Sequence, residues 1–172
     1  YYQPKLNFDG TKLYLSRNSG TGYYYSLNND TWELQGEYGY GSANYIRISD
    51  DFSTVVSGSS IYSLGESQAN AQLSTPGWVH NRTTSINEDG TIVAYHGNTI
   101  ARVFKNTNGD WQQLGQDVEI GDESIYSSYR ISLTADGLTF FAVATIDMDG
   151  DGSSNESGER FGRVFILLFK TK

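Results

Sequence analysis

An acidic segment near the end of the sequence, residues 147–157, contains the residue types that bind metal ions. Its carboxylates stand at alternate positions, and a glycine after them permits a sharp bend of the chain. Alternate residues in a tight loop can direct their oxygens toward one centre. The candidate ligands are the side chains of Asp147, Asp149, Asp151 and Asn155 and the carbonyl of Ser153.

The chemistry of these ligands favours calcium. All are hard oxygen donors, and Ca²⁺ takes about six to eight of them in a flexible geometry, whereas Mg²⁺ retains more water. The spacing does not fit an EF-hand, because Glu159 lies one place beyond the position of the bidentate glutamate and no flanking helices are predicted. A bound cation would order a long, self-repelling loop. The alternative is a solvated acidic connection that binds nothing.

The composition indicates which elements carry this loop. The 172 residues include 13 Tyr and 19 Gly but only 2 Pro, which favours strands and tight turns over helices. We expect a single all-β domain over residues 1–172, with almost no helix.

A pattern of strand, aspartate turn and strand recurs along the chain. The turn aspartates are Asp9, Asp51, Asp89 and Asp136. Three of them precede Gly, and Asp-Gly between apolar residues predicts a hairpin with a type I′ turn, in which both residues have positive φ. We interpret these aspartates as turn formers and not as catalytic carboxylates.

Each repeat continues with a third strand, and two repeats add a fourth strand that opens with Trp32 or Trp111. A unit of about 40 residues with four short antiparallel strands is typical of a β-propeller blade. We therefore predict a β-propeller-like domain of about four blades. A β-sandwich is the alternative, but it does not explain why the tryptophan strand recurs after the turn. The approximate repeats are residues 1–40, 41–79, 80–120 and 121–172.

The last repeat has no predicted fourth strand, which leaves three arrangements open. They are a closed ring of four blades, a fragment of a larger ring, and an open arc whose missing strand comes from a neighbouring subunit. An unpaired sheet edge invites strand addition, and a head-to-tail contact that does not close generates a filament.

The acidic segment resembles the calcium loops of FG-GAP repeats, which are the blades of integrin α-subunit propellers. Asp147-Met148-Asp149-Gly150-Asp151-Gly152-Ser153-Ser154-Asn155 matches the pattern Asp-x-Asp-x-Asp-Gly-x-x-Asp of those loops, with Asn155 in place of the final Asp. The wider repeat is similar to the tandem FG-GAP-like repeats of secreted and surface proteins. The resemblance implies a calcium-supported propeller, and the charge lost at Asn155 implies a weaker site. Its specific motifs lie in the last two repeats, and the first two lack an acidic loop.

Other features narrow the classes of function. The net charge of -8 and the scattered basic residues argue against nucleic-acid binding. The longest apolar run, Val164 to Phe169, is too short to insert into a bilayer. The start at Tyr1 without a leader is what we expect of a mature or excised piece. Cys is absent, and we expect His80 and His96 at turns or edges without a catalytic role.

Surface candidates complete the prediction. Tyr38, Tyr40 and Tyr45 stand in a Gly-rich stretch, and we expect them to be exposed, ligand-binding aromatic residues. The sequons at Asn29 and Asn81 are the predicted glycosylation sites.

Together these features predict a secreted or cell-surface β-propeller module with a structural or adhesive role, acting through protein–protein contacts. It would form homo-oligomers or a surface fibre through strand or edge contacts. Two alternatives stay open. One is a lectin-like module with a Tyr/Trp face, and the other is a glycan-active enzyme with carboxylates at the propeller axis.

Overall fold

The computed structural model describes residues 2–17, 21–40, 46–74, 84–97, 99–120, 129–147 and 160–168. Within these residues the regular secondary structure consists of β-strands only, and the strands form four consecutive antiparallel sheets. Sheet 1 contains β1 (Tyr2–Leu6), β2 (Lys12–Arg17), β3 (Thr21–Asn28) and β4 (Thr31–Gly39). Sheet 2 contains β5 (Ile46–Ile48), β6 (Thr54–Ser57), β7 (Ser60–Ser63) and β8 (Ala71–Gln72). Sheet 3 contains β9 (Thr84–Ile86), β10 (Ile92–Gly97), β11 (Ile100–Thr107), β12 (Asp110–Gln113) and β13 (Val118–Glu119). Sheet 4 contains β14 (Tyr129–Leu133), β15 (Thr139–Asp147) and β16 (Arg160–Leu168).

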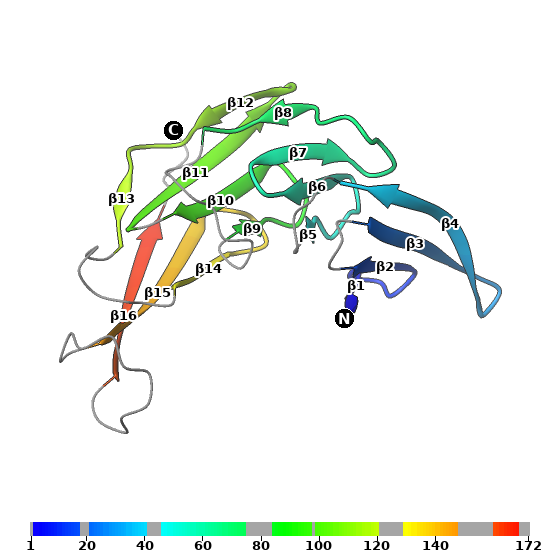
Figure 1. Ribbon diagram of the computed structural model, residues 1–172, viewed down its shortest axis with the longest axis horizontal. Coiled ribbons are helices and arrows are strands. Elements are labelled where there is room, and N and C mark those ends of the chain that lie inside the picture. Colours follow the sequence, from blue (N-terminus) through cyan, green and yellow to red (C-terminus); the bar gives the residue numbers. More distant parts are fainter. Residues whose placement is uncertain are drawn as a thin grey trace.

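The sheets follow one another along an arc, with sheets 1 and 4 at opposite ends and the first strand of each sheet on the concave side (Figure 1). Strands are ordered in each sheet as in the sequence, except that β13 pairs with β11. The prediction of an all-β chain built from small antiparallel sheets is confirmed. The described residues show no closed ring.

The turn between the first two strands of each sheet is held by its aspartate. In sheet 3 the Asp89 carboxylate accepts hydrogen bonds from the N–H and the hydroxyl of Thr91, at 3.0 and 2.6 Å. In sheet 1 the Thr11 hydroxyl and N–H bind Asp9 in the same way and hold the pKa of Asp9 below its ordinary value of 3.8. These contacts confirm the turn-forming role of the aspartates.

The predicted type I′ geometry of these turns is wrong. Positive φ occurs after the turn aspartates and not at them, which is the geometry of a type I turn followed by one left-handed residue. The left-handed residues are Gly10, Phe52, Gly90 and Gly137. Two successive residues with positive φ occur instead between the third and fourth strands, at Asn29-Asp30 and at Asn108-Gly109.

Three hydrophobic cores lie between successive sheets. Because side chains alternate along a strand, each sheet presents one face to the sheet before it and the other face to the sheet after it. We call these the rear face and the forward face. Residues that share a core across two sheets include Tyr14 with Val55, Val56 with Val93, and Ala94 with Phe140.

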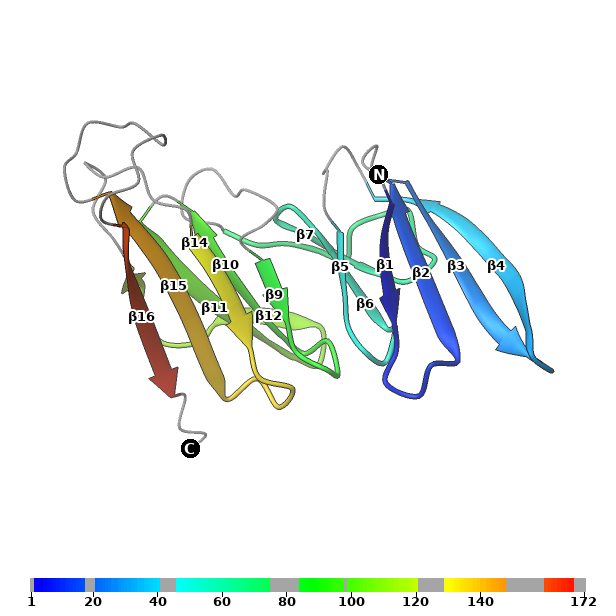
Figure 2. The same ribbon diagram turned by 90° about the horizontal axis from the view of Figure 1, so that it is seen from below.

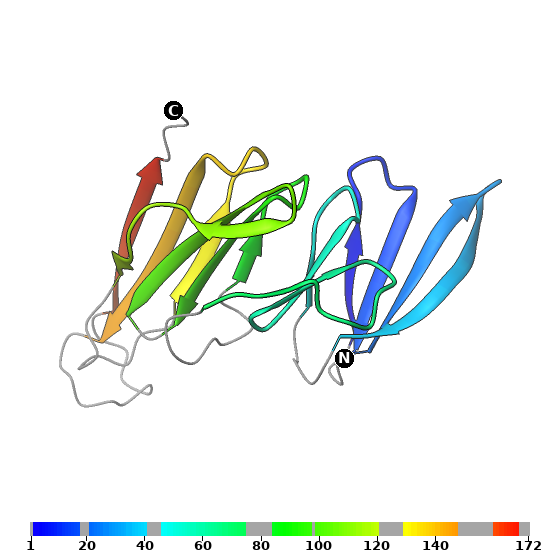
Figure 3. The same cartoon turned by 90° about the horizontal axis from the view of Figure 1, so that it is seen from above.

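The four aspartate turns lie on one side of the arc, along the lower edge in Figure 2 and the upper edge in Figure 3. Backbone hydrogen bonds link neighbouring turns directly. The Asp50 N–H donates to the Glu88 carbonyl at 2.9 Å, and the Glu88 N–H donates to the Ala135 carbonyl at 3.0 Å. The repeated turns therefore fix the stacking of the sheets as well as the register of each hairpin.

Candidate functional site

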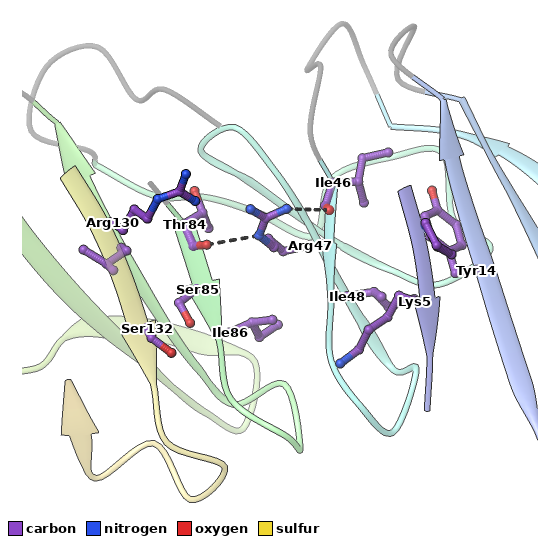
Figure 4. Close-up of a pocket in the computed structure, with 12 residues that line it drawn as sticks. Lys5, Tyr14, Ile46, Arg47, Ile48, Thr84, Ser85, Ile86, Arg130 and Ser132 are labelled. Atoms are coloured by element: carbon purple, nitrogen blue, oxygen red, sulfur yellow. Dashed lines mark hydrogen bonds between the residues drawn. The ribbon is translucent and has the colours of Figure 1, made fainter. Parts of the chain in front are cut away.

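A cavity of about 390 Å³ opens between the first strands of all four sheets, on the concave side of the arc (Figure 4). Its floor and rim are formed by β1, β5, β9 and β14 because these strands are the innermost of each sheet. The polar residues that line the cavity are Lys5, Arg47, Thr84, Ser85, Arg130 and Ser132.

Three of these side chains link one sheet to the next. Lys5 forms an ion pair with Asp50. The Nε of Arg47 donates a hydrogen bond to the Thr84 carbonyl at 3.3 Å. These contacts join sheets 1 and 2, and sheets 2 and 3.

The third link joins sheets 3 and 4, where the Ser85 hydroxyl accepts a hydrogen bond from the Leu133 N–H at 3.0 Å. Lys5, Arg47 and Ser85 all stand four residues before a turn aspartate, and Ser132 holds the same place in sheet 4. None of these residues was predicted from the sequence. The signal that could have identified these residues is their shared position, four residues before a turn aspartate.

The two ends of the arc expose apolar faces that are buried elsewhere in the chain. On the rear face, Leu6 of sheet 1 is 51% exposed, whereas the equivalent Ile48 and Leu133 are 6% and 9% exposed. All three stand three residues before a turn aspartate. Leu34, which shares the rear face of sheet 1, is also exposed. Sheet 1 therefore presents a core-like face with no sheet packed on it among the described residues.

The forward face shows the same contrast at the other end of the arc. Ile166 of sheet 4 is 61% exposed, whereas the equivalent Ile61 and Val103 are 2% and 3% exposed. Each of the three pairs with the residue five places after a turn aspartate. Val143 lies on the same face of sheet 4 and is exposed as well. The two end faces are thus the two halves of the interface that recurs inside the chain.

The predicted calcium loop falls mostly outside the described residues. Asp147 is the last residue of β15 and pairs with Arg160, the first residue of β16. The segment therefore connects the second and third strands of sheet 4. The remaining predicted ligands, Asp149, Asp151, Ser153 and Asn155, lie in the part of the chain that the structure does not describe. Within the described part, no group of three or more acidic or histidine side chains is placed to hold a metal ion.

The predicted exposure of Tyr40 is wrong, because its side chain is fully buried in the core between sheets 1 and 2. Its hydroxyl accepts a hydrogen bond from the Gly65 N–H, and burial raises the pKa of Tyr40 to about 12. Tyr38 packs partly buried against the same core, and Tyr45 lies outside the described residues. His96, expected at a turn or an edge, is buried in β10.

The predicted glycosylation sites and the tryptophans lie partly within and partly outside the described residues. Asn29 is exposed in the turn between β3 and β4, so its amide is accessible, whereas Asn81 lies outside the described residues. Trp111 packs against the core between sheets 2 and 3, and its counterpart Trp32 is exposed at the end of the arc. The described part of the chain contains no helix that is long and apolar enough to cross a membrane.

Comparisons with known proteins bear on the fold. No family model matches the sequence, and no curated protein matches it. Among solved structures, the chain is similar to a crystal structure from Bacteroides fragilis whose protein is described as a candidate 6-phosphogluconolactonase, with a TM-score of 0.50 and 16% identity over 69% of this chain. The chain spans 38% of the length of that protein. At this identity the likeness shows the fold alone, and the fold that the two share is all-β and propeller-like.

Proposed function

We propose that this chain is a structural or adhesive module whose propeller-like arc associates head to tail with further copies of itself. In such a contact the forward face of sheet 4 of one copy packs on the rear face of sheet 1 of the next. The observation that carries the proposal is the exposure of Leu6 and Ile166, because the equivalent residues in the internal interfaces are buried or partly buried against the neighbouring sheet.

A second copy is a suitable partner because each end face resembles the faces that pack on a neighbouring sheet inside the chain. Ser132 on the forward face of sheet 4 stands where Lys5, Arg47 and Ser85 bind the following sheet. A contact between unlike faces is heterologous, so it propagates to a ring if the rotation closes and to a filament if it does not. Either product matches the predicted role as a subunit of an extracellular assembly.

Blocking each end separately tests the proposal. Leu6→Glu places a charge on the rear face and Ile166→Glu places one on the forward face. Burying an unpaired carboxylate in an apolar contact costs several kcal/mol, so each variant should lose roughly 100-fold or more in self-association. Mixing the two variants should restore one contact only, between the intact forward face of the first and the intact rear face of the second. Sedimentation velocity over a concentration series should then show dimers and nothing larger.

The exposed Gln112→Glu on β12 is the matched control, because it adds the same charge away from both end faces, and it should assemble like the wild type. A wild-type chain that stays monomeric at the highest soluble concentration contradicts the proposal. So does a Leu6→Glu variant that still dimerises alone, since that result would mean that like faces pair. Binding to a glycan array without assembly would favour the lectin-like alternative.

Calcium binding by residues 147–155 stays a prediction of the sequence, supported by the spacing of its carboxylates. Calcium at about 100 times its dissociation constant should stabilise the chain by about 2.7 kcal/mol, which corresponds to about 5–10 °C in Tm for a domain of this size. Thermal melts with calcium and with a chelator measure the shift. Asp151→Asn should reduce it, and identical midpoints in calcium and chelator would reject the site.

A further inference from the structure

The cavity on the concave side differs in charge from the rest of the molecule. The chain carries a net charge of -8, yet Arg47 and Arg130 from two different sheets line the cavity beside Lys5, whose charge is paired with Asp50. Among the described residues that line it, none is acidic. Concentrated positive charge in a concave site with apolar walls attracts anions, because the field is focused there.

Arg47 is held in place before any ligand arrives. Its Nε donates to the Thr84 carbonyl at 3.3 Å, and its Nη1 lies 3.5 Å from the Ile46 carbonyl. These contacts orient the guanidinium group between β5 and β9, as Figure 4 shows. A fixed guanidinium group loses little conformational entropy when it binds a ligand, and its planar set of donors matches the oxygens of an oxyanion.

Arg130 supplies a second guanidinium group from the opposite wall. It belongs to β14 of sheet 4, and its side chain is exposed to solvent in the cavity mouth. In the view of Figure 4, Thr84 is drawn between Arg130 and Arg47, and all three residues line the cavity. Arg47 and Arg130 thus face the same part of the cavity from sheets 2 and 4.

Thr84 provides an independent sign of an unfilled polar site. Its side chain is 5% exposed, and its hydroxyl has no hydrogen-bond partner among the described residues. Buried hydroxyl groups are nearly always paired, because an unpaired one loses its bonds to water without replacement. A ligand oxygen held between the arginines would be a partner for this hydroxyl.

We propose that this cavity binds a small ligand through an oxyanion group, a carboxylate, sulfate ester or phosphate, held between Arg47 and Arg130 with Thr84 as a further donor. The apolar side chains Ile46, Ile48, Ile86 and Ile131 line the remainder of the cavity and suit a compact carbon skeleton. The site uses the first strands and leaves both end faces uncovered. Ligand binding and self-association are therefore separable.

Isothermal titration calorimetry with four probes tests the site and distinguishes the sources of the anion. The probes are glucuronate, glucose 6-sulfate, inorganic phosphate and uncharged glucose. At least one of the three anions should bind, glucose should not, and affinity should fall as salt increases, because exposed charges are screened. Arg130→Gln should weaken binding of that anion at least tenfold without loss of folding, since Arg130 is exposed. Thr84→Val should weaken it severalfold while keeping the shape of the side chain.

Lys105→Gln is the control, because Lys105 is an exposed cation on β11 outside the cavity and its loss changes the net charge equally. It should bind as the wild type does. Unchanged affinity in Arg130→Gln overturns the proposal, as does binding of glucose with the same affinity as the anions, or the absence of binding by all three anions. None of these results affects the Leu6→Glu and Ile166→Glu assembly experiment, so the two proposals fail separately.

Discussion

Replacing Ile61 by alanine should lower the free energy of unfolding by about 2–5 kcal/mol, whereas the same substitution at Ile166 should cost about 0.5 kcal/mol or less. The two isoleucines stand at equivalent positions on the third strands of sheets 2 and 4. Ile61 is buried between sheets 2 and 3, so its truncation leaves a cavity. Ile166 points from the end of the arc, where water already reaches it.

Urea denaturation measures both values at a protein concentration low enough to keep the chain monomeric. The pair is matched in residue type, strand and register, so the difference reports burial by a neighbouring sheet and little else. At concentrations where the chain assembles, Ile166→Ala should also weaken self-association, although it hardly changes the stability of the monomer. Equal loss of stability in the two dilute monomers would show that sheet 4 is covered within the chain, which would remove the basis for head-to-tail assembly.

Gly90→Ala should destabilise the chain by about 2–5 kcal/mol, and Gly10→Ala by about 1–2 kcal/mol. Both glycines follow a turn aspartate with nearly equal φ values of 71° and 72°. The left-handed conformation costs an alanine the same at either place. A Cβ at Gly90 would lie 2.7 Å from the Cβ of Thr54 in sheet 2, whereas nothing lies within 4 Å of a Cβ at Gly10. The difference between the variants is therefore the cost of forcing sheets 2 and 3 apart.

A Thr54→Ala background provides the control for this comparison. Removing the Thr54 side chain beyond Cβ relieves part of the crowding, so Gly90→Ala should cost less in that background, and the coupling energy of the double-mutant cycle measures the contact. Chemical denaturation of the four chains is sufficient. If Gly90→Ala and Gly10→Ala are equally destabilising, the turn of sheet 3 does not pack on sheet 2 as the structure places it.

Phe52 breaks the repeat at the turn of sheet 2, where a packed aromatic residue replaces the glycine of the other turns. It occupies the left-handed position that glycine holds in the other turns, with φ of 64°. A bulky residue is rarely found in this conformation, and the strain is retained only where surrounding structure determines it. Here the ring lies in the core between sheets 1 and 2, with its centroid 5.8 Å from that of Tyr24. Burial of the ring offsets the backbone strain.

The local hairpins were predictable from sequence because strand alternation and turn chemistry involve residues close in the chain. The Asp-x-Thr contacts of Asp9 and Asp89 are of this kind, and the aspartates were correctly interpreted as turn formers. The type I′ turn was predicted wrongly. Each aspartate has negative φ while its carboxylate accepts a hydrogen bond from the threonine N–H two residues later, and only the residue between them is left-handed.

Burial and the cavity depend on contacts between sheets, which local sequence does not reveal. Tyr40 stands in a Gly-rich stretch typical of an exposed loop, yet its ring packs against Tyr62 of the next sheet at a centroid distance of 5.2 Å. Arg47 and Arg130 are far apart in the sequence and line the same cavity only because the first strands of sheets 2, 3 and 4 converge on the inside of the arc.

The sequence alone therefore determined the all-β class and the place of the hairpin turns, because alternating side chains and short-range hydrogen bonds act within a few residues. Tertiary structure alone decided which apolar faces are covered and which are left open at the ends of the arc. Leu6 and Ile48 are alike in type and register, and only the presence or absence of a packed neighbouring sheet makes one exposed and the other buried.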